Sequence, residues 1–130
     1  MTFPDDRMYT KTHEWAKQEG ELVRVGITEY ATDQLGDIVY LDLPEVGKTV
    51  AQGDVLGEIE SVKAVAEFYA PIGGEVAEVS SSVLDDLDSI RQDPYGEAWM
   101  VVIKAGDLTE LSSLLDAAAY EQLCTEEAGQ

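Results

Sequence analysis

Basic side chains are scarce in this chain. Only 8 lysines and arginines stand against 27 acidic residues, which gives the 130 residues a formal net charge of −19. Nucleic acids and anionic membranes bind to basic surfaces, so this balance argues against both as partners. Long apolar runs are missing as well, and none approaches the roughly 20 residues that a membrane-spanning helix needs. We expect a monomer whose charge serves either solubility or partners with basic docking surfaces.

Cysteine and histidine occur once each, as Cys124 and His13. A single cysteine excludes an intramolecular disulfide and is typical of a reducing compartment. Cys124 lies near a polar tail with no base beside it, so we do not expect it to be a nucleophile. One histidine excludes a histidine-rich metal site, and a catalytic triad would have to use it. We predict no metal site and no catalytic residue, and for His13 packing plus one hydrogen bond.

The first seven residues contain two aspartates and no apolar core, unlike a secretory signal. The expected location is therefore the cytoplasm, or the mitochondrial matrix if a transit peptide has been removed. The length of the chain predicts one domain, residues 1–130, with a sizeable core. Its ends, 1–7 and 125–130, are expected to be flexible.

Short segments of alternating polarity, separated by glycine-marked turns, predict a mainly β fold. The expected strands cover 22–27, 38–43, 75–79 and 100–104. Thr28 is placed to cap a short helix that Gly36 would end. Asp107 and Glu110 have the spacing of a capping box, and a second helix is expected to start near Asp116. The polar stretch 80–90 is expected to hold one or two helical turns.

A β-hairpin centred on Lys63 organises the middle of the chain, between Gly53 and Gly74. Its predicted cross-strand pairs are Glu60–Val65, Ile59–Ala66, Glu58–Glu67 and Gly57–Phe68. This register places Val55, Gly57 and Ile59 on an apolar face, opposite Ala70, Phe68 and Ala66. Leu56, Glu58 and Glu60 then fall on the solvent face.

The expected hairpin loop consists of two residues, Val62 and Lys63. The favoured two-residue turns need positive φ angles, for which a β-branched valine is a poor choice. A turn whose residues do not suit its expected backbone geometry marks a place to look for function. A solvated lysine at a loop tip is the commoner situation, so the lysine alone decides nothing.

Three runs together resemble the glycine cleavage system H protein family. The first is Glu60-Ser61-Val62-Lys63-Ala64, followed by the run Tyr69 to Val76. Together these two segments resemble the hairpin that carries lipoyl-lysine in swinging-arm carriers. The others are Tyr9 to Trp15 and Asp93 to Trp99. They occur in the family's order, and the resemblance covers roughly residues 8 to 123. Its main departure is the stretch 80–90, which is less acidic than expected and lacks a proline.

The resemblance implies a non-catalytic carrier built from two antiparallel sheets, packed as a flattened barrel-sandwich with short helices and a C-terminal helical segment. Lys63 would bear lipoic acid as an amide, attached by a lipoate-protein ligase or a lipoyl or octanoyl transferase. The arm would take an aminomethyl group from the pyridoxal-phosphate-dependent glycine decarboxylase to aminomethyltransferase. Dihydrolipoamide dehydrogenase would then reoxidise it. The cofactor supplies the chemistry, and the protein supplies reach and recognition.

The resemblance also implies roles for the neighbours of the lysine. Recognition by the attaching enzyme is expected to use Glu58, Glu60, Ser61, Val62 and Ala64. Shielding of the loaded arm is expected from Thr12, Glu14 and Glu67, because carboxylates and hydroxyls can accept hydrogen bonds from an ammonium group.

Two alternatives from other classes stay open at this point. One is a lipoyl carrier, or a lipoate relay, for other lipoyl-dependent enzymes. The other is an unmodified acidic interaction domain, or an acid–base enzyme using Glu58, Glu60 or Glu67. Paired carboxylates on an exposed hairpin face are more often solvated, and the sequence indicates no substrate cleft.

Overall fold

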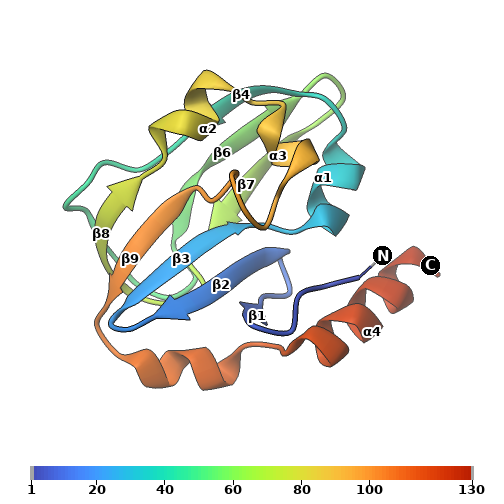
Figure 1. Cartoon of the computed structure of the whole chain (residues 1–130). Helices are drawn as coiled ribbons and strands as arrows, with labels where there is room; N and C mark the ends of the chain where they lie inside the picture. Colours follow the sequence, from blue (N-terminus) through green and yellow to red (C-terminus); the bar gives the residue numbers. More distant parts are fainter. Residues whose placement is uncertain (1, 130) are drawn as a thin grey trace.

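Two antiparallel sheets form the body of the protein in the computed structural model, which describes residues 2–129 (Figure 1). The six-stranded sheet has the order β1 (Met8–Tyr9), β2 (Glu14–Glu19), β3 (Leu22–Ile27), β9 (Val101–Ala105), β8 (Gly74–Val79) and β5 (Thr49–Val50). The three-stranded sheet has the order β4 (Ile38–Asp42), β6 (Val55–Ser61) and β7 (Val65–Tyr69). The predicted mainly β fold with two antiparallel sheets is confirmed.

Short helices connect and flank the sheets. They are α1 (Glu29–Leu35), α2 (Ser81–Asp85), α3 (Ser89–Gln92), the 3₁₀ helix η1 (Leu108–Ser113) and α4 (Ala117–Ala128). The predicted cap of α1 is confirmed, because the Thr28 side chain accepts a hydrogen bond from the Ala31 amide. Gly36, with φ 78°, ends the helix and donates its N–H to the Thr32 carbonyl. Among residues 2–129, no helix has the length and apolar character needed to cross a bilayer.

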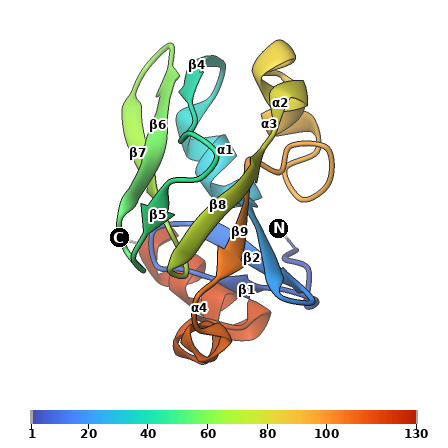
Figure 2. The ribbon, with the colours of Figure 1, turned by 90° about the vertical axis from the view of Figure 1, so that its left-hand side faces the viewer.

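The main core lies between the two sheets, whose separation is visible in Figure 2. Alternate residues of the central strands bury their side chains there, as the period of a strand requires. Val23 and Val25 of β3, Ile103 of β9, and Ile59 and Phe68 of the β6–β7 hairpin are almost fully buried. A second, aromatic cluster packs α4 against β1 and β2, and contains Phe3, Tyr9, Trp15, Tyr120 and Cys124.

The β6–β7 hairpin confirms the predicted register from Gly57 to Glu60, but the start of β6 corrects the predicted faces. A bulge separates the pairs Val55–Tyr69 and Gly57–Phe68. As a result Leu56, expected on the solvent face, is only 3% exposed, whereas Val55, expected in the core, is 41% exposed. The extra residue of a bulge shifts the alternation by one position.

The hairpin loop avoids positive φ, which corrects the reasoning about its turn. Of the described non-glycine residues only His13, with φ 74°, has a positive φ. Two hydrogen bonds between Ser61 and Ala64 close the turn without positive φ angles. The Ser61 hydroxyl oxygen accepts from the Ala64 amide at 3.0 Å, and the Ser61 amide donates to the Ala64 carbonyl at 2.8 Å. A β-branched Val62 is therefore compatible with this turn.

The C-terminal third contains one further correction. Asp107 caps η1 through the Thr109 amide, but Glu110 does not complete a capping box. Its carboxylate instead accepts a hydrogen bond of 2.8 Å from the Gly73 amide, 37 residues away in the sequence. The stretch 80–90 forms α2 and the start of α3, within the one or two turns expected.

Helix α4 begins after Asp116, as predicted, and the Asp116 side chain accepts from the Ala119 amide. The helix continues to Ala128. Phe3, from the N-terminal end of the chain, packs against Tyr120 of this helix. The flexibility of 1–7 and 125–130 and the single domain 1–130 stay predictions, and residues 1 and 130 lie outside the described part.

Candidate functional site

Lys63 is exposed at the apex of the β6–β7 hairpin. Besides the Ser61 bonds, the Val62 amide donates to the Asp37 carbonyl at 3.1 Å, which ties the apex to the end of α1. The Lys63 side chain lies over Gly36: a Cβ added at Gly36 would be 3.5 Å from Cε and 4.0 Å from Nζ of the lysine. The bare glycine therefore leaves the space in which the lysine rests against the helix end.

The outer face of the three-stranded sheet is acidic. Its register aligns Asp42, Glu58 and Glu67 in one row across the three strands, and Tyr40, Glu60 and Val65 in the next row. Like charges placed directly opposite one another cost some stability. The sequence indicated the Glu58–Glu67 pair, but Asp42 joins the row only through the pairing of β4 with β6.

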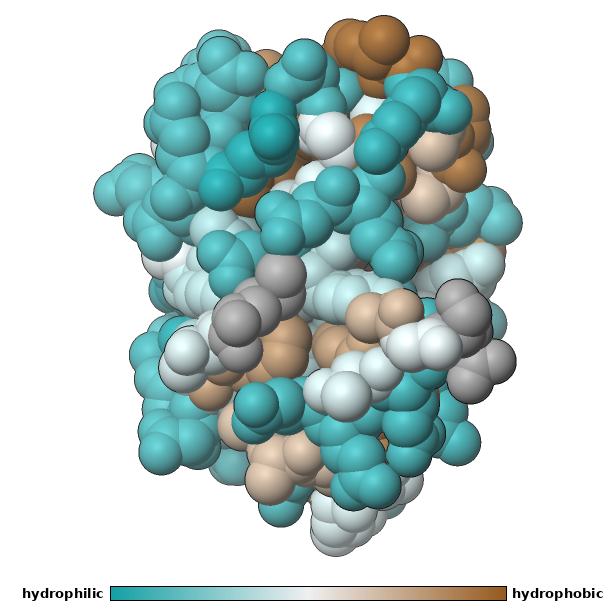
Figure 3. Space-filling view, turned by 90° about the vertical axis from the view of Figure 1, so that its right-hand side faces the viewer, coloured by the Kyte–Doolittle hydropathy of each residue, from teal (hydrophilic) through white to brown (hydrophobic). Residues whose placement is uncertain are grey.

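Apolar side chains are exposed close to the apex. Val62 is 76% exposed and Val65 is 63% exposed. Figure 3 shows hydrophobic atoms gathered at the top of the face, over the hairpin tip. The surface around Lys63 therefore combines apolar side chains at the tip with the acidic rows behind them.

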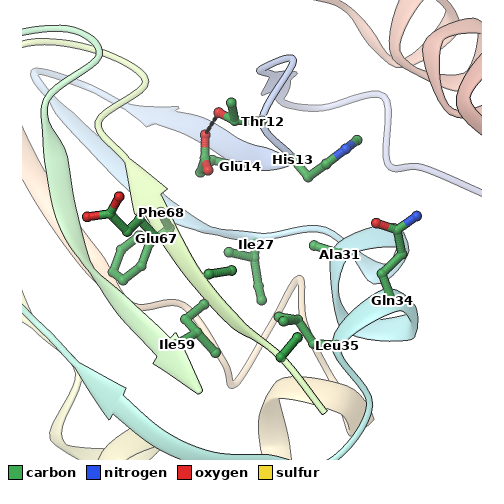
Figure 4. Close-up of a pocket in the computed structure, with 12 residues that line it drawn as sticks. Thr12, His13, Glu14, Ile27, Ala31, Gln34, Leu35, Ile59, Glu67 and Phe68 are labelled. Atoms are coloured by element: carbon green, nitrogen blue, oxygen red, sulfur yellow. Dashed lines mark hydrogen bonds between the residues drawn. The ribbon is translucent and has the colours of Figure 1, made fainter. Parts of the chain in front are cut away.

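A cavity of about 280 Å³ lies beneath the inner face of the hairpin. Its walls come from four segments: the turn before β2 with the first residue of that strand, the end of β3, helix α1 and the hairpin. The lining residues are Thr12, His13, Glu14, Ile27, Ala31, Gln34, Leu35, Ile59, Ala64, Ala66, Glu67 and Phe68 (Figure 4). Because Ala64 adjoins Lys63 in the chain, the hairpin apex stands at the edge of this cavity.

Glu14 is the unusual residue of the cavity, since only 1% of it is exposed. One carboxylate oxygen, Oε1, accepts hydrogen bonds from the Thr10 hydroxyl at 2.6 Å and from the Thr12 hydroxyl at 2.5 Å. The other, Oε2, is buried and has no hydrogen-bond partner. Burial raises the pKa of Glu14 to about 7, while the hydrogen bonds from Thr10 and Thr12 and the nearby backbone N–H groups of Tyr69 and Glu14 oppose the rise.

The structure brings the three residues predicted to shield the arm around one cavity. Glu14 lies inside it, whereas Thr12 and Glu67 are exposed lining residues. Glu58, Glu60, Ser61, Val62 and Ala64, predicted for recognition, all belong to the hairpin. Ser61 is buried and shapes the turn, which leaves the other four as candidates for contact with a partner.

The sequence reasoning missed several parts of this site. Thr10, which bonds Glu14, and the cavity wall formed by Ala31, Gln34 and Leu35 were not singled out. A signal for the wall existed, because Ala31 and Leu35 are four residues apart in the predicted helix and share one face. His13 makes two polar contacts, not one, through Nδ1 with Tyr120 at 2.7 Å and through Nε2 with Glu127 at 3.0 Å.

Comparisons with known proteins agree over almost the whole chain. The family model described as Glycine cleavage H-protein matches residues 7–127. A glycine cleavage system H protein of Thermus thermophilus is 48% identical over 128 residues, 98% of this chain and 100% of the relative. One from Geobacillus kaustophilus is 48% identical over 97% of this chain and 99% of its own. The crystal structure of a glycine cleavage system H protein from Mycobacterium marinum superimposes with a TM-score of 0.85 at 38% identity, covering 97% of this chain and 99% of that one.

The raised pKa of Glu14 predicts a specific pH dependence of stability. Unfolded Glu14 loses its proton near its ordinary value of 4.5, whereas the folded protein keeps it up to about pH 7. Between these values the unfolded state binds fewer protons, so the Glu14 contribution to the unfolding free energy falls as pH rises. Relative to Glu14→Gln, the wild type should lose about 3 kcal/mol between pH 4.5 and pH 8.

Urea unfolding of both proteins across this pH range measures the difference. The other carboxylates titrate in both proteins, so subtracting the two curves isolates Glu14. Parallel curves would show that Glu14 ionises normally in the folded protein.

Proposed function

We propose, from the premise that this chain belongs to the glycine cleavage H-protein family, that Lys63 is its lipoyl attachment site. The family is the lipoyl-bearing, non-catalytic shuttle of the glycine cleavage system, and it carries lipoate on a lysine. The observation that carries the assignment is the position of Lys63, at an exposed hairpin apex on the edge of a cavity that holds a buried carboxylate with a free oxygen.

The other lysines lack this setting. Lys17 lies in β2 and pairs with Asp6 at 3.5 Å. Lys104 lies within β9, and Lys11 and Lys48 lie in turns outside the hairpin. An attaching enzyme must reach the ε-amine itself, and the hairpin presents Lys63 away from the body of the sheets.

The cavity fits a lipoyl arm. Its volume is close to the lower end of the range for small-molecule pockets, about 300 Å³, and most of its lining is apolar, as suits a hydrocarbon chain and a dithiolane ring. When bound, the lipoyl group supplies a disulfide that can be reduced to a dithiol. The protein's own residues hold and shield the arm.

Glu14 is suited to the cargo. The aminomethyl group carries a cationic amine, and Oε2 of Glu14 is free to accept its hydrogen bond. A cation beside Glu14 favours the ionised carboxylate and so lowers its raised pKa. Thr12 stands at the rim, where its hydroxyl can accept a further hydrogen bond from the ammonium group. Glu67 also lines the cavity, but its carboxylate lies in the outer row with Glu58, so its contribution would be a negative charge near the rim.

The chain works with the other proteins of the glycine cleavage system. In finer detail we assign it glycine decarboxylase as donor, aminomethyltransferase as acceptor and dihydrolipoamide dehydrogenase as the enzyme that reoxidises the arm. A lipoate-protein ligase or a lipoyl or octanoyl transferase would modify it. Because the relatives described above are bacterial, the cytoplasm is the proposed location.

Modification should occur at Lys63 alone. Protein made in lipoate-replete cells, digested with trypsin or Glu-C and analysed by mass spectrometry, should show the lipoyl mass only on the peptide with Lys63. Lys63→Arg keeps the charge and lacks the primary amine, so it should fold normally and support no glycine cleavage. Lipoate on Lys48 or Lys104 would disprove the assignment.

The next prediction concerns recognition of the hairpin by the attaching enzyme. The acidic residues Glu58 and Glu60 lie behind the tip that Val62 and Ala64 form, and exposed charges steer a basic partner to its docking position. Glu60→Gln should lower the kcat/KM of lipoylation about fivefold at low salt and less at high salt. The thermal midpoint should stay within about 2 °C.

Glu75→Gln is the matched control, because Glu75 is an exposed acid on β8 in the other sheet. It removes the same charge far from the hairpin tip and should leave lipoylation unchanged. Equal rates for both variants at low salt would rule out a recognition role for Glu60.

The last prediction of this proposal concerns shielding of the loaded arm by Glu14. Lipoylated protein is loaded with the aminomethyl group, and its spontaneous loss is timed by the release of formaldehyde and ammonia. Glu14→Gln keeps an acceptor for Thr10 and Thr12 but loses the charge, so it should release the group about tenfold faster. It should accept lipoate at the wild-type rate, and Glu75→Gln again serves as the control. Equal rates of loss would mean that Glu14 does not hold the arm.

A further inference from the structure

Tyr120 of α4 connects two walls of the cavity from behind. Its ring is fully buried in the aromatic cluster, and its hydroxyl lies 2.7 Å from Nδ1 of His13 and 2.6 Å from the Thr28 hydroxyl. Neither Tyr120 nor any other residue of α4 lines the cavity. The helix therefore acts on the cavity from the second layer, through the side chains that Tyr120 bonds, the contact of Glu127 with His13 and the packing of Tyr30 against the aromatic cluster.

Each partner of Tyr120 fixes one wall. His13 stands between Thr12 and Glu14, in a left-handed conformation with φ 74° that non-glycine residues rarely adopt. Figure 4 shows its ring directed away from Glu14. Thr28 caps α1, the helix of the opposite wall, and its amide donates to the His13 carbonyl at 3.0 Å.

One arrangement of hydrogens satisfies the whole chain of groups. The Ala31 amide donates to the Thr28 oxygen, the Thr28 hydroxyl donates to Tyr120, and Tyr120 donates to Nδ1 of His13. Nε2–H of His13 then donates to Glu127, at 3.0 Å. This needs a neutral His13, in agreement with the burial that lowers its pKa against the opposing effect of Glu127.

We propose that Tyr120 is a positioning residue for the cavity beside Lys63: its hydroxyl keeps the Thr12–Glu14 turn and the start of α1 at a fixed distance from each other. The proposal rests on the proposed function of the cavity. It gives α4 a role in retaining the cargo, although the helix touches neither the lysine nor the cavity.

The hydroxyl, and not the ring, carries this role. The ring stacks on Tyr9 at 4.7 Å and meets Phe3 edge-on at 4.8 Å, contacts that phenylalanine would also make. Tyr120→Phe therefore keeps the packing but leaves the Thr28 hydroxyl and Nδ1 of His13 without their partner. The turn that carries Glu14 then keeps the Thr28–His13 backbone hydrogen bond and the His13–Glu127 contact but loses the link through Tyr120. Its position becomes less fixed, and we expect water to reach the carboxylate.

Tyr9→Phe is a matched control from the same stack. Tyr9 is also fully buried, and its hydroxyl bonds only the Pro4 carbonyl, away from the cavity. Tyr9→Phe loses one buried hydrogen bond and Tyr120→Phe loses two, so both variants should be destabilised, Tyr120→Phe by more. Only Tyr120→Phe should affect the cavity.

The first measurement uses unlipoylated protein. Titration of the Glu14 side-chain carboxyl by carbon-13 NMR should give a midpoint lower by about half a pH unit or more in Tyr120→Phe, because the carboxylate becomes hydrated. Tyr9→Phe should titrate as the wild type does. The second measurement is the loss of the aminomethyl group, which Tyr120→Phe should accelerate about fivefold.

His13→Asn provides an independent variant if Tyr120→Phe does not fold. Asparagine tolerates the left-handed conformation but cannot reproduce both contacts of the imidazole, so it should act like Tyr120→Phe. The positioning role would be overturned if Tyr120→Phe, or His13→Asn in its place, behaved like Tyr9→Phe in both measurements. If Glu14→Gln accelerates loss but Tyr120→Phe does not, only the present inference fails. If Glu14→Gln has no effect, the shielding function itself fails.

Discussion

The burial of one incompletely bonded carboxyl group sets the requirements for the functional end of the molecule. A buried carboxylate is costly unless its oxygens are hydrogen-bonded or a cation is near. Thr10 and Thr12 satisfy only one oxygen of Glu14, so the group either keeps its proton or, as we propose, gains a cationic group beside the other oxygen. Apolar walls from α1 and the hairpin surround the carboxyl group, which is only 1% exposed, and this burial keeps the cost of its charge high.

Local patterns in the sequence predicted the elements but not every register. The hairpin pairs and the Thr28 cap depend on neighbouring residues, so alternation and capping rules were sufficient. The bulge at Leu56 was not predictable, because Val55 and Leu56 are both apolar and alternation cannot separate them. The constraint on the next residue also comes from distant segments: at Gly57 a Cβ would come 2.7 Å from Cε1 of Phe68 and would overlap the Asp42 carbonyl of β4, so only glycine fits there.

The site divides in the same way between local and distant contacts. Lys63 and its neighbours form one continuous segment, so the resemblance of that segment to a known hairpin was enough to propose them. The cavity joins segments around Glu14, Ala31 and Ala66, which meet only through the packing of two sheets. Glu110 and Tyr120 illustrate the same limit, since their partners Gly73 and His13 are 37 and 107 residues away.

The alternation of the hairpin connects recognition to shielding. Glu58 and Glu60 point to the outer, acidic face, whereas Ile59 and Phe68 point inward to the core and the cavity. Lys63 lies at the apex where the two faces meet, so the proposed attaching enzyme could approach it from outside and the proposed arm could fold to the inside. A slip of one residue in the pairing would exchange the faces and disrupt both proposed roles together. Under this proposal the register of the one hairpin determines both where the lysine would be recognised and where its arm would be held.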